Sequence, residues 1–109
     1  MAGEFDRRQG HEVPRVEWLP EAAKDVERLH AFLELKNKRA ASNAVKCILG
    51  GINILKNSPN IGRPMDDETG RRELFLPYGA GAYVLRYKTT NEVVVIIRVW
   101  HSKENLSIK

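Results

Sequence analysis

The chain has 109 residues and a mass of 12.4 kDa, which is the size of one domain and leaves no room in it for a second. Hydrophobic residues make up 42% and charged residues 29%, a balance typical of a globular protein rather than a disordered one. Lys and Arg number 18 and Asp and Glu 14, so the formal net charge is +4, which alone does not indicate nucleic-acid binding.

Cysteine and histidine usage excludes further classes. Cys47 is the single cysteine, so the chain has no internal disulfide, and its three histidines are far apart in the sequence. We therefore expect no metal site and no cofactor. No apolar run approaches the roughly 20 residues of a membrane span, and the first fifteen residues lack the apolar core of a secretory signal, so we expect a cytoplasmic protein without a membrane partner.

The N-terminal end begins with a polar stretch. Residues 1–13 show no periodic apolar pattern, so we expect a tail that is either disordered or derived from an expression vector. Residues 14–105 should form a single domain, and residues 106–109 would be a short C-terminal tail. The first element is predicted at Val13–Trp18, as a short strand with Val16 and Trp18 on one face.

An amphipathic helix is predicted over residues 20–36. Pro20 suits its first position, and Glu21 and Asp25 lie near the positive end of the helix dipole. Asn37 would break it. Its apolar residues recur every three or four positions, at Leu19, Ala22, Ala23, Val26, Leu29 and Leu33.

A second amphipathic helix is predicted over residues 39–56, with a stripe at Ala41, Val45, Ile48, Ile52 and Leu55. Gly50 and Gly51 weaken this helix by about 1 kcal/mol each, and we expect them to allow close packing on the first helix. Because the link between the helices is short, they should form an antiparallel hairpin.

Three strands are predicted after this hairpin. Residues 61–64 and 66–70 resemble loops, and the strands follow at Arg71–Leu76, Ala82–Lys88 and Val93–Trp100. The last strand is apolar on both faces, so it should lie inside the sheet. The order β-α-α-β-β-β predicts an α+β domain, in which the helical hairpin packs on a small, twisted and mainly antiparallel sheet.

Arg98 is the unusual residue of the last strand. Strict alternation places Val95, Ile97 and Val99 on one face and Val94, Ile96, Arg98 and Trp100 on the other. A buried unpaired charge is very costly, so Arg98 needs a partner. An ion pair with Glu73 or Asp66 is the favoured interpretation, and a contact with an anion or a partner protein is the alternative.

Cations and aromatic residues alternate in the sheet half of the sequence. Such a mixture can bind phosphate and stack bases, although the same residues can also be core edges and solvated charges. The cations are Arg63, Arg71, Arg72, Arg86, Lys88, Arg98 and Lys103, and the aromatic residues are Tyr78, Tyr83, Tyr87 and Trp100.

His101 follows the last strand. Such a histidine can act as a general acid or base near neutral pH, but a structural cap for the strand end is the favoured interpretation. Ser102 has no evident base to activate it as a nucleophile. Cys47 is expected to be a small core residue, and His30 a surface residue.

Five segments taken in order resemble the RelE/ParE superfamily of type II toxins. They are VEWLPEAAKDV at 16–26, SPNIGRP at 58–64, GRREL at 70–74, GAYVLRY at 81–87 and VIIRVWHSKE at 95–104. The resemblance covers about residues 14–105 and implies the same fold, a helical hairpin on a small antiparallel sheet.

The resemblance implies one of two mechanisms. Members similar to RelE cleave mRNA on the ribosome, where basic residues on the sheet orient the phosphate and promote attack by the 2′-hydroxyl. Members similar to ParE poison DNA gyrase and carry out no hydrolysis. Both kinds are neutralised by a cognate antitoxin, a segment of which wraps the toxin surface.

Departures from the RelE pattern favour the ParE-like mechanism. A RelE-type site would place a Lys-x-Lys pair on the strand that here reads Glu73-Leu74-Phe75, and an Arg at the position of Val84. Lys103 stands where a RelE-type Arg would lie, and His101 is a candidate substitute base. Losing these cations would remove much of the electrostatic stabilisation of the transition state.

Three hypotheses follow from the resemblance. In the first, the chain is not an enzyme but a gyrase-binding toxin, whose contacts with target or antitoxin come from Arg63, Arg72, Arg86, Arg98, Trp100 and His101. In the second it is an mRNA interferase, with His101 as acid or base and with Arg86 and Lys103 holding phosphate. In the third it is an inactive module that only binds an antitoxin.

A protein partner is expected in each case. The paired helices and an exposed strand edge would form a groove for an amphipathic segment of an acidic antitoxin, giving a toxin–antitoxin hetero-oligomer.

Overall fold

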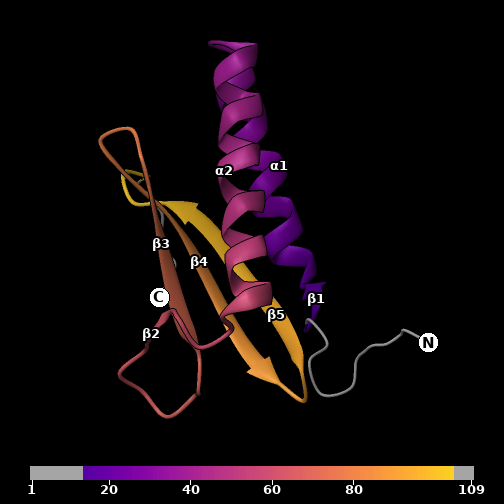
Figure 1. The fold of residues 1–109 in the computed structure, drawn as a ribbon. Helices are drawn as coiled ribbons and strands as arrows, with labels where there is room; N and C mark the ends of the chain where they lie inside the picture. Colours follow the sequence, from indigo (N-terminus) through magenta and orange to yellow (C-terminus); the bar gives the residue numbers. More distant parts are fainter. Residues whose placement is uncertain (1–13, 105–109) are drawn as a thin grey trace, which may run out of the picture.

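A pair of long helices covers one face of a five-stranded sheet (Figure 1). The computed structural model describes residues 14–104, so the two predicted tails lie outside the described residues. The elements are β1 (Arg15–Trp18), α1 (Pro20–Glu34), α2 (Lys38–Asn57), β2 (Arg63–Pro64), β3 (Arg72–Tyr78), β4 (Gly81–Thr90) and β5 (Val93–His101). No helix among them is both long and apolar enough to cross a bilayer.

The strands lie in the order β1-β5-β4-β3-β2. Strand β1 pairs with β5 in parallel, and every other pair is antiparallel. The predicted α+β class and the interior position of the last strand are therefore confirmed. Strand β2 was missed, because a pairing of two residues, Arg63 with Glu73 and Pro64 with Arg72, leaves no periodic signal in the sequence.

The two helices begin and end close to the predicted residues. Pro20 occupies the first turn of α1, which ends at Glu34, two residues before the predicted end. Asn37 separates the helices and also caps α2, since its side-chain oxygen accepts hydrogen bonds from the backbone N–H of Arg39 at 2.9 Å and of Ala40 at 3.1 Å.

The core lies between the apolar stripes of the helices and one face of the sheet. Its largest buried side chains include Ile48, Leu55, Leu85, Tyr87 and Ile96. Helix α2 approaches the sheet closely at Gly51, where a Cβ atom would overlap Leu76 and Leu85. The prediction that the two glycines pack against the first helix is therefore wrong: Gly51 contacts the sheet, and a Cβ at Gly50 would meet nothing.

A β-bulge changes which residues of β5 enter the core. Arg86 pairs with Arg98 but Tyr87 pairs with Ile96, so Ile97 is an extra residue on β5. Val94 and Ile96 are consequently buried on the same core face as Val99. Strict alternation predicted them on opposite faces, which is wrong because the bulge shifts the pattern by one residue. The opposite face of the sheet, which the helices leave uncovered, is called the open face below (Figure 1).

The strand ends also differ from the predictions. Strand β3 continues through Pro77 to Tyr78, beyond the predicted end at Leu76. Strands β4 and β5 are joined by Asn91 and Glu92, both at positive φ, which is the geometry of a two-residue type I′ hairpin turn.

Tyr87 fixes the loop that leads from α2 to the sheet. Its buried hydroxyl donates to the carbonyl oxygen of Pro59 at 2.8 Å and accepts from the N–H of Gly62 at 2.9 Å. Burial raises the pKa of this tyrosine, so the hydroxyl stays protonated. Arg72 donates to the carbonyl oxygens of Asn60 and Gly62 in the same loop.

We predict that Tyr87→Phe lowers the free energy of unfolding by roughly 1–3 kcal/mol, because it leaves a buried N–H without a partner. Chemical denaturation measures the change. Tyr78→Phe is the matched control, since within residues 14–104 the Tyr78 hydroxyl makes one long hydrogen bond, 3.4 Å from the oxygen of Ala40. Equal losses in the two variants would contradict the role given to Tyr87.

Candidate functional site

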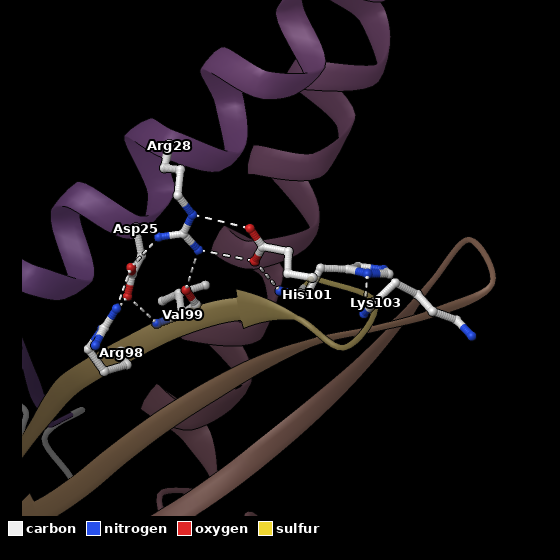
Figure 2. A network of polar contacts seen from close by, with 7 residues as sticks. Asp25, Arg28, Arg98, Val99, His101 and Lys103 are labelled. Atoms are coloured by element: carbon white, nitrogen blue, oxygen red, sulfur yellow. Dashed lines mark hydrogen bonds and ion pairs between the residues drawn. The ribbon is translucent and has the colours of Figure 1, made fainter. Parts of the chain in front are cut away.

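Asp25 of α1 is a buried carboxylate that holds the helix against β5 (Figure 2). Its oxygens accept hydrogen bonds from Arg98 Nε at 2.7 Å, from Arg98 Nη2 at 3.0 Å and from the backbone N–H of Val99 at 2.9 Å. Arg28, one helical turn further along α1, also donates to it. The predicted partners of Arg98, Glu73 and Asp66, are therefore wrong.

Arg28 extends this contact to the end of the strand (Figure 2). Its Nε and Nη2 atoms each lie 3.1 Å from a carboxylate oxygen of Glu104, and its Nη2 lies 3.4 Å from the carbonyl oxygen of Val99. Glu104 in turn accepts the backbone N–H of His101 at 2.9 Å. Strand β1 pairs with β5 only as far as Ile96, so these side chains satisfy backbone groups that a longer β1 would have paired.

The four side chains are called the edge clamp: Asp25, Arg28, Arg98 and Glu104. Burial raises the pKa of the Asp25 carboxyl, but hydrogen bonds from Arg98, Val99 and Arg28 outweigh burial and hold that pKa below its usual value of 3.8. The carboxylate therefore stays ionised at neutral pH. Each arginine of the clamp is about one third exposed, so both guanidinium groups keep part of their hydration.

A row of charged residues crosses the open face. Arg63 of β2, Glu73 of β3, Arg86 of β4 and Arg98 of β5 are successive cross-strand partners. Arg86 is only 6% exposed, donates to Glu73 at 2.7 Å and stacks 5.0 Å from the ring centre of Trp100.

Arg63 lies at the outer end of this row. Its guanidinium stacks 5.3 Å from the ring centre of Phe75, which is 43% exposed. The described part of the chain offers Arg63 no carboxylate within ion-pair distance. A solvent-exposed cation and aromatic ring therefore lie together at this edge of the open face.

The structure brings four of the six predicted contact residues together on the open face, namely Arg63, Arg86, Arg98 and Trp100. The other two predicted contact residues, Arg72 and His101, lie elsewhere. Arg72 lies opposite Tyr87 and holds the loop described above, so its role is structural. His101 lies opposite Tyr83 and faces the helices.

A groove of about 610 Å³ lies on the helical side of the sheet, beside His101. It runs between the C-terminal half of α1, the β3–β4 turn and the residues that follow β5. Its walls are mostly apolar or aromatic, with Lys103 and Glu104 at the rim. They include Leu29, Phe32, Leu33, Tyr78, Gly79, Ala80, Tyr83 and His101.

The ring of His101 is held by both nitrogens. Its Nδ1 accepts the backbone N–H of Lys103 at 3.1 Å, so we assign the proton to Nε2, which donates to the carbonyl oxygen of Tyr78 at 3.0 Å. The ring also packs edge-on against Tyr83, with ring centres 4.9 Å apart. The arrangement matches the favoured interpretation of a strand cap, and it leaves neither nitrogen free for proton transfer.

Other reactive groups are also engaged or shielded. Ser102 Oγ accepts the backbone N–H of Ala82 at 3.0 Å. Cys47 packs against the core, and burial raises the pKa of its thiol. Burial likewise raises the pKa of Tyr83 to about 12. Within residues 14–104, no three His, Cys, Asp or Glu side chains come together in a way that would hold a metal ion.

The role of Asp25 was not predicted from the sequence, and the groove was predicted in a different place. Asp25 did carry a signal, because it lies between Ala22 and Leu29 on the apolar stripe of its helix, where a carboxylate requires a partner. A groove was expected at the paired helices and an exposed strand edge, whereas the walls of this groove come from α1, the β3–β4 turn and the end of β5, segments that are far apart in the sequence.

Comparison with known proteins agrees with this fold. The sequence profile of a family described as the ParE toxin of the type II toxin–antitoxin system parDE matches residues 16–106. Toxin RelE1 of Caulobacter vibrioides is 32% identical over 83 residues, which are 76% of this chain and 87% of that protein. Toxin RelE3 of the same species is 35% identical over 89 residues, which are 82% of this chain and 95% of that protein.

Two solved structures share the fold. The chromosomal ParDE system from P. aeruginosa gives a TM-score of 0.66 at 21% identity, over 82% of this chain and 96% of that one. The toxin–antitoxin complex RelBE2 from Mycobacterium tuberculosis gives 0.57 at 23% identity, over 89% and 100%.

The matched sequence and the helical hairpin on its sheet define the chain as a toxin of a type II toxin–antitoxin system, in the superfamily that contains ParE and RelE toxins. Within that superfamily it belongs to the ParE toxin family, whose profile spans almost the whole described domain.

We predict that Asp25→Asn lowers the free energy of unfolding at pH 7 by about 3 kcal/mol, because it leaves two arginines without their shared carboxylate. Glu17→Gln is the matched control: Glu17 forms an exposed pair with Arg15, whose loss should cost less than about 1 kcal/mol.

The same substitution should change the response to acid. The folded-state pKa of Asp25 is depressed, so its contribution is complete above the unfolded-state pKa and is lost as the pH falls through the folded-state value. Urea titrations between about pH 2 and pH 7 should therefore show a shallower loss of stability at low pH in Asp25→Asn than in the wild type. Parallel curves for the two proteins would contradict the clamp.

Proposed function

We propose that this toxin inhibits bacterial growth by binding and poisoning DNA gyrase, and that its open face contacts the target. The single observation that carries the proposal is that two of the cations predicted for this face, Arg86 and Arg98, are already neutralised by carboxylates. Arg86 pairs with Glu73 and Arg98 pairs with Asp25.

An mRNA interferase would need the opposite arrangement. Attack by a 2′-hydroxyl places developing negative charge on the phosphate, and preorganised cations aimed at that charge are usually the largest catalytic contribution. Here the position of the RelE-type Lys pair is occupied by Glu73-Leu74-Phe75, so a carboxylate stands in the middle of the row. Arg63 and Lys103 remain available, but Arg63 is on the open face and Lys103 is at the groove, so they do not converge.

The open face has the composition of a protein-binding surface. Arginine, tryptophan and phenylalanine are enriched in protein interfaces, where aromatic rings and guanidinium groups supply contact area and hydrogen bonds. Arg63, Phe75 and Trp100 provide these groups around the buried Arg86–Glu73 pair.

The groove is the proposed site of the antitoxin. Its apolar walls would bind an amphipathic segment, and Lys103 at its rim would attract a carboxylate of that segment. The RelBE2 structure, a toxin–antitoxin complex, supports a hetero-oligomer of this kind. Placing the antitoxin in the groove and the target on the open face puts the two functions on opposite sides of the sheet.

A second candidate function is mRNA cleavage on the ribosome, which the names of the two Caulobacter relatives favour. In this chain it would require His101 as acid or base, with Arg86 and Lys103 on the phosphate. His101 and Arg86 would each have to break the hydrogen bonds that hold them in order to take part.

We predict that Arg63→Glu weakens inhibition of purified gyrase by roughly tenfold or more, because it reverses the exposed charge on the open face. A supercoiling assay with increasing toxin measures this. Lys56→Glu is the matched control, since Lys56 is exposed on α2 and lies on the other side of the sheet. Full supercoiling at excess wild-type toxin would contradict the gyrase proposal itself.

We also predict that His101→Ala keeps its toxicity when the protein is expressed in a bacterial host without antitoxin. The ring would be a cap rather than an acid or base, so its loss affects stability alone. Circular dichroism must show that the variant is folded. A folded variant that no longer inhibits growth, together with mRNA cleavage by the wild type only, would favour the interferase.

The same expression experiment distinguishes the third hypothesis, an inactive binding module, from the two toxic mechanisms. Normal growth in the presence of folded, soluble wild-type chain would support it and contradict both mechanisms.

A further inference from the structure

The closed end of the helical hairpin extends beyond the sheet (Figure 1). We call five of its residues the tip surface: Phe32, Leu35, Lys36, Lys38 and Arg39. All five are exposed. Leu35 is 89% exposed and Phe32 is 58% exposed, so two large apolar side chains lie in solvent at a position where neither contributes to the core.

The tip surface is also positively charged. Residues 36–39 contain Lys36, Lys38 and Arg39 and no carboxylate. Asn37 lies among these cations, and its side-chain oxygen is engaged in capping α2. Lys36 lies over the ring of Phe32 at 4.8 Å, so the cations and the apolar side chains form one surface rather than two.

This surface is continuous with the groove. Phe32 belongs to both, since it lines the groove from α1 and supports Lys36 at the tip. Tyr78, on the opposite wall of the groove, places its hydroxyl 3.4 Å from the carbonyl oxygen of Ala40 in the first turn of α2. A chain that leaves the groove along α1 therefore passes directly onto the tip.

We propose that the tip surface is a second docking site for the antitoxin, which takes an acidic, apolar segment that continues out of the groove. The inference rests on the proposed antitoxin site in the groove. The choice of occupant follows from charge: three cations beside two exposed apolar side chains match a protein segment in which carboxylates flank apolar residues. Nucleic acid would match the cations but not Leu35.

The test uses the full chain in complex with its cognate antitoxin, co-expressed and purified. In the tip variant, Lys36→Glu, Lys38→Glu and Arg39→Glu are combined. In the control variant, Lys24→Glu, Lys46→Glu and Lys56→Glu make the same change of charge at exposed helical positions outside the tip. We expect the tip variant to weaken antitoxin binding by roughly tenfold or more and to reduce its dependence on salt, and the control to change it little.

A groove variant separates this inference from the proposal on which it rests. Ala80 lines the groove, is exposed and is not part of the tip surface, so Ala80→Trp is directed at the groove alone. If Ala80→Trp weakens binding and the tip variant binds like the control, the second docking site is wrong and the groove site stands. If neither variant weakens binding, both are wrong.

Hydrogen exchange supplies an independent readout that does not depend on charge reversal. Amides of residues 32–39 should exchange more slowly in the complex than in the isolated toxin. Unchanged exchange in the complex would overturn the proposal. Protection that instead grows with the concentration of the isolated toxin would identify a second copy of this chain as the occupant, and would also overturn it.

Discussion

The carboxylate of Asp25 is the interaction on which the arrangement of the molecule depends. Strand β1 is too short to pair with the whole of β5, and helix α1 takes over the unpaired edge through side chains rather than backbone. Burying a carboxylate is costly, and this cost is offset because the group accepts hydrogen bonds from two arginines and a backbone N–H. The same contacts set the position of α1, and therefore the walls of the groove that lies beside its second half.

The ion pairs of Arg98 and Arg86 also bear on function, because they neutralise positive charge that could otherwise hold a phosphate. Arg98 is directed round the strand edge to Asp25, and Arg86 is buried between Glu73 and Trp100. A sheet with the fold of this superfamily can therefore carry many arginines and still present little free positive charge to a phosphate. The number of basic residues in such a sequence is therefore a poor guide to catalysis, because carboxylates placed among them can neutralise their charge.

Local sequence patterns predicted the helices and most of the strands. Features that depend on contacts between distant segments could not be predicted from them. Apolar stripes located both helices within about two residues at each end. Four of the five strands were also located within about two residues, because turn residues separate them. The bulge at Ile97 and the two-residue strand β2 depend on pairing with distant segments, so neither has a local signal. Among the site residues, the shared face of Arg98 and Trp100 followed from alternation along one strand. The partner of Arg98 lies 73 positions away and had to be observed.

Pulse labelling distinguishes the proposed action on DNA replication from an action on mRNA. Cells that express the chain without antitoxin would be labelled with thymidine and with methionine during the first minutes after induction, beside cells that express Arg63→Glu. We expect thymidine incorporation to fall first, and the fall to be smaller in the variant. A fall in methionine incorporation that precedes any change in thymidine would contradict the proposed action on gyrase and would identify translation as the target.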